Sequence, residues 1–362
     1  MPLDEPAEPD SGDCAIPHDS GPPGTGQDDA PRRQGEGMDP RVRVILNPHA
    51  GSKAGISTNL DDAEDVIRQL MDEHGLGRDL VISGSEDEAV AATRDAVRRG
   101  FGTVVAAGGD GTVGGIAREL LGTDTALAIL PLGSVMNIAR MLDLPRDLHD
   151  AAQAIADARA ADSVRVIDVG RATGQDGDVV FFEAASVGMN AVIFREANRF
   201  GDGDWRGLFS AIRVAFRYRP ARMIIHLDNR TITSRALMVA IANGPYTGIG
   251  FTVAPGASLE DGMFDVRLFR RFSRWELFRH FRSIAFGGRA FAPKAETYRS
   301  ARVRVEGHSR LPARADSHDL GTTPVTFDVV PAALRIVSPL PPPGHEPADK
   351  AADRQPAPSA GP

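Results

Sequence analysis

The chain has 362 residues, which is enough for two domains with separate hydrophobic cores, and its formal net charge at pH 7 is −8. Residues 1–40 contribute −8 and residues 341–362 contribute −1, so residues 41–340 between them carry about +1. A near-neutral folded part lacks the positive charge of a nucleic-acid-binding protein, and we expect no nucleic-acid partner.

Both ends of the chain are rich in proline, glycine and acidic residues and poor in large apolar ones. We therefore expect residues 1–40, an acidic tail, and residues 341–362 to be disordered. The single cysteine, Cys14, lies in the first tail, which excludes an intramolecular disulfide and favours a reducing compartment. The start has neither the basic nor the apolar region of a signal peptide. We expect a cytoplasmic protein. The sequence does not decide between a free protein and one in peripheral contact with the inner membrane face, or between a monomer and a homodimer.

Residues 41–163 alternate between predicted strands and helices. Aliphatic and β-branched runs predict the strands, and apolar residues at helical spacing predict the helices. This alternation indicates a doubly wound α/β domain that binds its ligands at the carboxyl ends of the strands. The predicted strands are 41–46, 80–82, 102–105 and 126–130, and the predicted helices are 60–73, 86–99 and 117–121.

A glycine-rich segment, AAGGDGTVGGI, follows the third strand at residues 106–116. Gly108 and Gly109 would let backbone N–H groups approach a phosphate, and Thr112 would cap the following helix and hold a phosphate oxygen. The carboxylate of Asp110 would repel a phosphate unless a cation lay between them, which indicates a magnesium nucleotide. A glycine-rich turn that binds nothing is the alternative.

Two better-known phosphate loops do not explain this segment. Residues 109–114 match the dinucleotide fingerprint GxGxxG, but the next strand ends in Pro131-Leu132-Gly133 and not in an acidic residue, so we interpret the match as accidental. The GxxxxGK[ST] motif of P-loop proteins does not occur.

Two further motifs stand at strand ends. The first predicted strand runs into NPHAG at 47–51, and the fourth runs into PLGSVMN at 131–137. With GGDGT at 108–112 between them, the motifs resemble NPxxG, GGDGT and PxGTxN of the diacylglycerol kinase catalytic domain. Bacterial lipid kinases, diacylglycerol kinases and sphingosine kinases share this domain. NAD kinases also carry GGDGT, so the order of the three motifs carries the resemblance.

The resemblance implies ATP and Mg²⁺ as cofactors and a lipid substrate met at a membrane surface. It makes residues 41–163 the ATP-binding domain. The nucleotide-contacting positions that it implies are Asn47, Pro48, His49, Ala50, Gly51, Ser52, Gly84, Gly108, Gly109, Asp110, Gly111, Thr112, Gly133, Ser134 and Asn137.

From residue 164 onward the pattern changes to short strands separated by turn signals, which predicts a mostly antiparallel β domain. In the family that the chain resembles, the second domain is a β-sandwich, so we expect a β-sandwich lipid-substrate domain over residues 164–340. The predicted strands are 164–169, 179–184, 223–227, 235–242 and 263–269, and long helical stretches are predicted at 190–217 and 273–286.

Asp261-Gly262 lies between two predicted strands, where such a pair by itself predicts a hairpin turn. In the resembled family an aspartate at this place holds a magnesium ion together with two main-chain oxygens. Carried over, the ligands are Asp261 and the carbonyl oxygens of Ser258 and Met263, an oxygen set that suits magnesium or calcium.

A basic run with interleaved aromatic residues follows. One interpretation is a solvated helix that packs its phenylalanine face on the β domain, and the other is a surface for anionic lipid headgroups. The arginines of this run are Arg267, Arg270, Arg271, Arg274, Arg279, Arg282 and Arg289.

The last motif of the family, DGE, has a glutamate that accepts the proton of the substrate hydroxyl. Its place falls on Asp316-Ser317-His318, so the aspartate is kept and the glutamate is replaced by histidine. The catalytic residues that the resemblance implies are Asp316, His318 and Asp110.

Our hypothesis from the sequence is a lipid kinase that phosphorylates a hydroxyl of diacylglycerol or a related lipid. A catalytically impaired nucleotide-binding protein and a kinase of a soluble substrate such as NAD are the alternatives, although the NxxD motif expected of NAD kinases is not evident.

Overall fold

The computed structural model describes residues 39–49, 60–133, 135–197, 213, 217–247, 251–270 and 295–339. The predictions for both tails, for Ala50, Gly51, Ser52 and Ser134, for the helical stretch at 273–286 and for the arginines beyond Arg270 lie outside these residues. None of the described helices is long and apolar enough to span a membrane.

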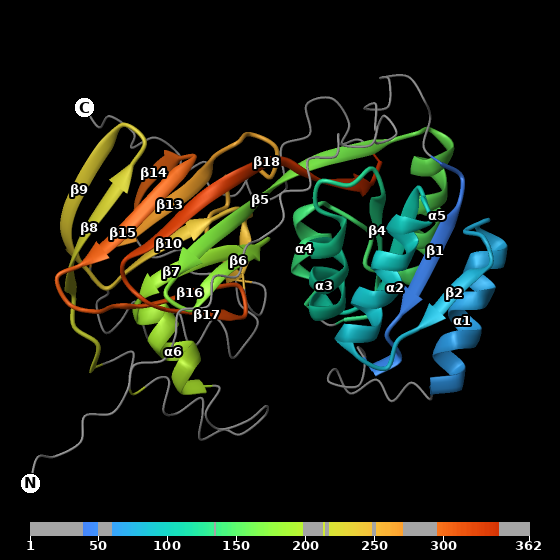
Figure 1. Ribbon diagram of the computed structural model, residues 1–362, viewed down its shortest axis with the longest axis horizontal. Coiled ribbons are helices and arrows are strands. Elements are labelled where there is room, and N and C mark those ends of the chain that lie inside the picture. The colour runs from blue at the N-terminus through green and yellow to red at the C-terminus, as the bar shows by residue number, and fades with distance from the viewer. Residues whose placement is uncertain are drawn as a thin grey trace, which may run out of the picture. The chain divides into compact units, whose positions relative to one another are not determined.

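The first half of the chain is built on a parallel sheet in the order β2-β1-β3-β4 (Figure 1). Strands β1, β3 and β4 are buried along their whole length, as expected of parallel strands that are covered on both faces. The strands are β1 (Val42–Leu46), β2 (Asp79–Ile82), β3 (Thr103–Gly108) and β4 (Ala126–Pro131).

Helices cover the two faces of this sheet because successive strand residues point to opposite sides. On one face Val104 and Ala106 pack with α2 (Glu86–Arg98) and α3 (Asp110–Leu120). On the other face Val105 and Ala107 pack with α1 (Leu60–Glu73) and α5 (Leu148–Ala160). The doubly wound α/β arrangement is therefore confirmed.

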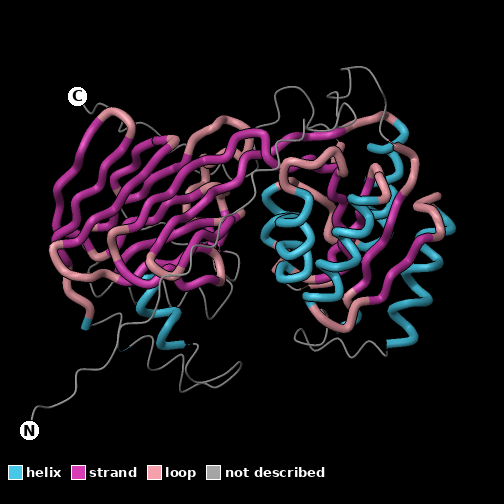
Figure 2. The backbone as a smooth tube through the Cα atoms, viewed as in Figure 1, coloured by secondary structure: helices cyan, strands magenta, loops and turns pink. Residues whose placement is uncertain are grey.

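Two long antiparallel strands, β5 (Val164–Gly174) and β18 (Val325–Val337), connect the first sheet with the second half. At one end of β18, Ile336 pairs with Leu127 of β4, and at the other end β18 pairs with β15. Figure 2 shows these strands as continuous magenta tubes. This sheet continues through β6 (Gly177–Phe181), β15 (Arg302–Gly307), β8 (Ala221–Leu227) and β9 (Arg230–Ala236).

A second, antiparallel sheet packs against this extension, which confirms the predicted β-sandwich. Between the sheets the Phe181 ring stacks on Phe264 at a centroid distance of 5.6 Å and meets Phe327 edge-on at 6.2 Å. The second sheet has the order β14 (Glu296–Ser300), β13 (Phe264–Phe269), β10 (Met238–Ala242), β7 (Ala184–Gly188), β16 (Pro312–Ala315) and β17 (His318–Thr322).

Several predicted boundaries were wrong. Helix α3 begins at Asp110, seven residues earlier than predicted, because the glycines of residues 110–116 adopt helical backbone. These are Gly111, Gly114 and Gly115. Its N-cap is Gly109 and has no side-chain hydrogen bond, so Thr112 does not cap it. The predicted strand 179–184 spans the turn between β6 and β7. The described part of the predicted helix at 190–217 includes α6 (Met189–Ala197). Neither α4 (Asn137–Met141) nor α5 (Leu148–Ala160) was predicted.

Candidate active site

In the strand order 2-1-3-4, the chain moves from β1 to β2 on one side of the sheet and from β3 to β4 on the other, so β1 and β3 flank a topological switch point. Open α/β sheets bind ligands in the crevice outside the carboxyl ends of the strands at such a point. Two of the motifs meet there. The backbone N–H of Asn47 donates to the carbonyl oxygen of Ala107 at 2.9 Å, and its side-chain Nδ2 donates to Thr112 Oγ1 at 3.0 Å. The NPHAG and GGDGT segments are thus joined by direct hydrogen bonds.

The third motif packs against the second. Leu132 N–H donates to the carbonyl oxygen of Gly108 at 3.1 Å. A Cβ atom on Gly133 would lie 2.9 Å from Gly109 Cα and 2.8 Å from Met136 Sδ, and one on Gly108 would lie 2.7 Å from Thr112 Cβ. A larger residue at Gly133 would push the two segments apart, and one at Gly108 would displace Thr112 within its own segment, so both positions require glycine.

Asp110, the first residue of α3, is bound to the start of α4. Its Oδ2 accepts a hydrogen bond from Met136 N–H at 2.9 Å. Burial raises the pKa of the Asp110 carboxyl, while the backbone amides of Met136, Asn137 and Ile138 act in the opposite direction. These amides give the carboxylate a partner at a helix N-terminus, an interaction that the sequence did not reveal. The aspartate therefore holds the PLGSVMN segment against the GGDGT segment.

The other predicted nucleotide-contacting residues have local roles. His49 N–H donates to Asn47 Oδ1 at 3.0 Å, which forms a turn over Pro48. Gly84 lies beyond β2, where its N–H donates to Glu88 Oε2 at 2.6 Å, so this amide is already bound within the chain. Asn137 is buried in the first turn of α4. Within the GGDGT segment, Gly111 is the one residue classed as exposed, whereas Gly108 and Thr112 are buried.

In the second half, Asp316 forms the turn between β16 and β17 with a φ of 45°. Its carboxylate accepts hydrogen bonds from the backbone N–H groups of Phe182 (2.8 Å), Glu183 (3.1 Å) and Ala184 (3.1 Å). Burial raises the pKa of the Asp316 carboxyl, and the three amides oppose that shift. With three of its acceptor positions filled by backbone, Asp316 anchors the β6–β7 turn to the β16–β17 turn.

His318, the first residue of β17, is half-buried and lies within electrostatic reach of the first half of the chain. Burial lowers the pKa of the His318 imidazole, the positive charge of Arg118 from α3 lowers it further, and Glu86 from α2 opposes both. The Arg118 guanidinium lies 3.7 Å from Glu86 Oε1. A neutral imidazole in this place can accept a proton.

Sequence reasoning missed Arg118. It stands two helical turns beyond the GGDGT motif, and its Nε is buried with no hydrogen-bond partner among the described residues. Nothing in the residue pattern distinguishes it from the exposed arginines of the neighbouring helix. Only the pairing of distant segments brings it near His318.

The predicted magnesium ligands lie in one turn, and both carboxylate oxygens of Asp261 are engaged there. Asp261 Oδ1 accepts from Met263 N–H at 3.1 Å, and Oδ2 forms an ion pair with Arg299. Ser258 Oγ accepts from Glu260 N–H at 3.3 Å. The Asp261 carboxylate would have to release Arg299 before it could bind a cation, and the carbonyl oxygens of Ser258 and Met263 stay predicted ligands.

Two family models match the chain in sequence. The diacylglycerol kinase catalytic domain matches residues 41–172, and the YegS C-terminal NAD kinase beta sandwich-like domain matches residues 183–338. A diacylglycerol kinase of Mycobacterium tuberculosis (strain ATCC 25618 / H37Rv) is 28% identical over 303 residues, 83% of this chain and 95% of that protein. A diacylglycerol kinase of Bacillus subtilis (strain 168) is 24% identical over 306 residues, 83% of this chain and 96% of that protein.

A crystal structure of a diacylglycerol kinase from Bacillus anthracis str. Sterne superposes with a TM-score of 0.59 at 19% identity, covering 83% of this chain and 97% of that one. At this identity the superposition establishes a shared fold. The family models add the sequence signature of both halves, in the order in which the motifs stand. This chain belongs to the diacylglycerol kinase catalytic-domain family.

Proposed function

We propose that this chain is an ATP-dependent lipid kinase that transfers the γ-phosphoryl group to a hydroxyl of diacylglycerol or a related lipid. The observation that carries the proposal is the junction of Asn47, Gly108–Thr112 and Gly133 at the switch point of the sheet. Membership of a kinase family supports phosphoryl transfer, and the names of the relatives support a lipid as the acceptor.

The nucleotide phosphates would bind at the start of α3. The first hydrogen bond inside this helix runs from Val113 N–H to the carbonyl oxygen of Gly109, so the amides of the three preceding residues have no acceptor within the helix. Free amides at a helix N-terminus suit phosphate oxygens. A divalent cation bound with the nucleotide would neutralise charge on the β- and γ-phosphates. Asp110 Oδ2 accepts from Met136 N–H, whereas Oδ1 is buried without a hydrogen-bond partner among the described residues and would be the oxygen available to such a cation.

His318 would be the base. The oxygen of the lipid hydroxyl attacks the γ-phosphorus, the bond from that phosphorus to its bridging oxygen breaks, ADP leaves with the electron pair, and the hydroxyl proton passes to the imidazole of His318. Asp316 would act as a positioning residue through the turn that it anchors. Arg118 would keep the imidazole neutral before the reaction.

A direct assay tests the proposal. Purified protein is incubated with γ-labelled ATP and magnesium, with extracted lipids in one reaction and NAD in another. We expect label in a lipid phosphate. Label in NADP alone would establish the soluble-substrate alternative. ATP binding without transfer to either acceptor would establish the impaired protein, for which the replacement of glutamate by His318 is the observation in favour.

A further inference from the structure

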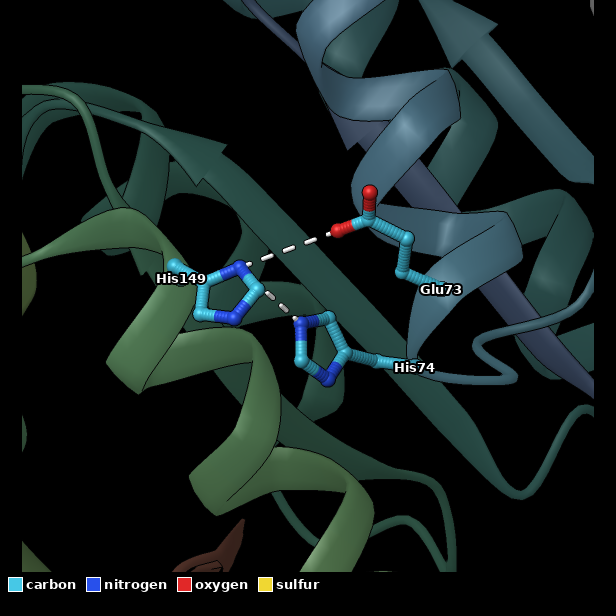
Figure 3. Close-up of side chains that lie close together, drawn as sticks. All are labelled: Glu73, His74 and His149. Atoms are coloured by element: carbon cyan, nitrogen blue, oxygen red, sulfur yellow. Dashed lines mark hydrogen bonds and ion pairs between the residues drawn. The ribbon is translucent and has the colours of Figure 1, made fainter.

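Glu73, His74 and His149 gather on the α1–α5 side of the first sheet, outside the motifs of the proposed kinase site (Figure 3). His74 Nε2 lies 3.4 Å from His149 Nδ1, and His149 Nδ1 lies 3.7 Å from Glu73 Oε2. One ligand atom of each residue lies within 4.8 Å of both others. Two imidazole nitrogens, which face each other at hydrogen-bond distance, and a carboxylate oxygen thus lie together at the end of α1 and the start of α5.

The backbone holds each of these residues in place. His74 N–H continues the helical hydrogen bonding of α1 by donating to Leu70 at 3.0 Å, and the next residue, Gly75, ends the helix with a φ of 63°. His149 lies in the first turn of α5, where its N–H donates to the N-cap carboxylate of Asp147 at 2.8 Å. The C-terminal end of α1 therefore sets the position of His74, and the first turn of α5 sets that of His149.

A shared core fixes the two helices relative to each other. Leu70 and Met71 of α1 belong to the same buried cluster as Ala151 and Ile155 of α5. Glu73 and His149 are thus presented by two packed helices, and His74 by the residue that directly follows α1, which favours a metal site with defined geometry.

Gln69 supports the glutamate from outside the cluster. Its Nε2 donates to Glu73 Oε1 at 2.7 Å, which leaves Oε2 as the oxygen that faces His149. Hydrogen bonds that orient a ligating carboxylate in this way are a regular part of protein metal sites.

Two of the three distances between ligand atoms are close to those around a tetrahedral metal ion, and the third is at most 4.8 Å. For metal–ligand bonds of about 2.0–2.1 Å, neighbouring ligand atoms in a tetrahedron lie about 3.3–3.4 Å apart. The nitrogen–nitrogen distance of 3.4 Å already has this value, and the nitrogen–oxygen distance of 3.7 Å is close to it. Two imidazoles and one carboxylate suit zinc and disfavour the hard cations magnesium and calcium.

We propose that Glu73, His74 and His149 bind a zinc ion, with a position left for water, and that the ion clamps the end of α1 to the start of α5. The site is independent of the proposed kinase reaction, because none of its residues belongs to the motifs. Its consequence is on stability, since a ligand that binds only the folded chain raises the melting temperature.

The test uses the full chain after chelator treatment and dialysis. Zinc chloride is titrated by calorimetry, and the melting temperature is measured with and without zinc. We expect one tight site in the wild type and a higher Tm with zinc. His74→Ala and His149→Ala should remove the tight site and the Tm increase. Gln69→Leu should weaken zinc binding by roughly 10–100-fold while leaving the stoichiometry unchanged.

His308→Ala is the matched control, because His308 is an exposed histidine outside the cluster, and this variant should bind zinc as the wild type does. His149→Asn is a second substitution at the same ligand, and circular dichroism checks that each variant is folded. The proposal is overturned if the His74→Ala and His149→Ala variants bind zinc as tightly as the wild type. It is equally overturned if the wild type binds zinc only at millimolar concentrations.

Discussion

Asp316 and His318 stand two positions apart in one turn, yet their surroundings assign them different roles. The Asp316 carboxylate accepts three backbone hydrogen bonds, whereas the His318 ring is half-buried near the guanidinium of Arg118. Three amides hold the Asp316 carboxylate in place, which suits a positioning residue, whereas the neutral imidazole of His318 keeps a ring nitrogen able to accept a proton. In the proposed reaction, the replacement of glutamate by His318 would keep a base in this turn.

The first prediction concerns the pH dependence of His318. Because burial and Arg118 lower the pKa of this imidazole, it stays neutral until the pH falls below the ordinary histidine value of about 6.5. Kinase activity should decline as the pH drops through that lowered pKa. His318→Ala should lose ~10²–10⁴-fold in kcat, and His318→Glu should retain substantial activity and extend it to lower pH.

Arg118→Met is the control for this prediction. Removing the positive charge should raise the pKa of His318, so the acidic limb of the pH–rate profile should move to higher pH. An unchanged acidic limb in Arg118→Met, or full activity of His318→Ala, would show that His318 is not the base.

The second prediction concerns Asp316 and stability. Asp316→Ala leaves three backbone N–H groups without their acceptor and places alanine at a positive φ. Hydrogen bonds to charged groups contribute about 1.5–3 kcal/mol each, so the free energy of unfolding should fall by at least about 2 kcal/mol. Denaturant unfolding measures the change. A variant as stable as the wild type but inactive would instead point to a direct catalytic role.

At the scale of elements, α3 and α4 are held together by contacts between their N-terminal residues. Asp110 accepts from the amides at the start of α4, and Gly133 packs on Gly109 without room for a side chain. A change at either place acts on the geometry of the proposed phosphate site through the contact between two helix N-termini.

The third prediction is that Gly133→Ala raises KM for ATP and lowers the melting temperature, because its Cβ would lie 2.9 Å from Gly109 Cα. Gly114→Ala is the matched control within α3. Its Cβ would find no atom nearer than Arg118 Nη2 at 3.9 Å, and glycine-to-alanine in a helix interior stabilises by roughly 0.5–1 kcal/mol. Equal effects of the two substitutions on KM would contradict the close packing of the segments.

The fourth prediction is that Asp110→Ala abolishes turnover while the fold is retained. The variant frees the amides around Met136 and loosens the segment that leads into α4. Steady-state assays with magnesium ATP and a nucleotide-binding titration separate a loss of binding from a loss of transfer. Wild-type activity in this variant would place the nucleotide elsewhere.

At the scale of the whole chain, β5 and β18 belong to both cores. Ile167 and Leu334 pack in the core of the first half, while Ala172 and Phe327 pack in that of the second. The two halves of the chain are thus joined by strands that are packed in both cores. The domain boundary between residues 163 and 164 stays a prediction. The first family model ends at residue 172 and the second begins at residue 183.

The fifth prediction concerns the membrane. Arg270 forms an ion pair with Glu296 at 2.8 Å and Arg267 donates to Val253 at 2.7 Å, so these two guanidinium groups are engaged within the chain. The later arginines of the run are the better candidates for lipid contact, each worth roughly 1 kcal/mol near an anionic surface. Binding to anionic vesicles should fall with salt and in an Arg279→Ala/Arg282→Ala double variant.

Arg270→Ala is the matched control and should bind vesicles like the wild type. Equal binding to neutral and anionic vesicles at low salt would exclude an electrostatic membrane contact.

The sequence by itself determined the class of each half and the location of the nucleotide motifs. Hydrophobic periodicity and glycine-rich strand ends are local properties, so the strands, most of the helices of the first half and the NPHAG, GGDGT and PLGSVMN segments could be predicted. The family resemblance rests on the same local segments and was confirmed by the two family models.

Only the tertiary structure decided which groups face one another. The amides that bind Asp110 and Asp316, the arginine near His318 and the ion pair of Asp261 all come from segments distant in the chain, and no local pattern specifies them. The Glu73–His74–His149 cluster depends likewise on the packing of α1 against α5. Side-chain chemistry depends on burial and on partners across the fold, and those are properties of the packed chain rather than of its local sequence.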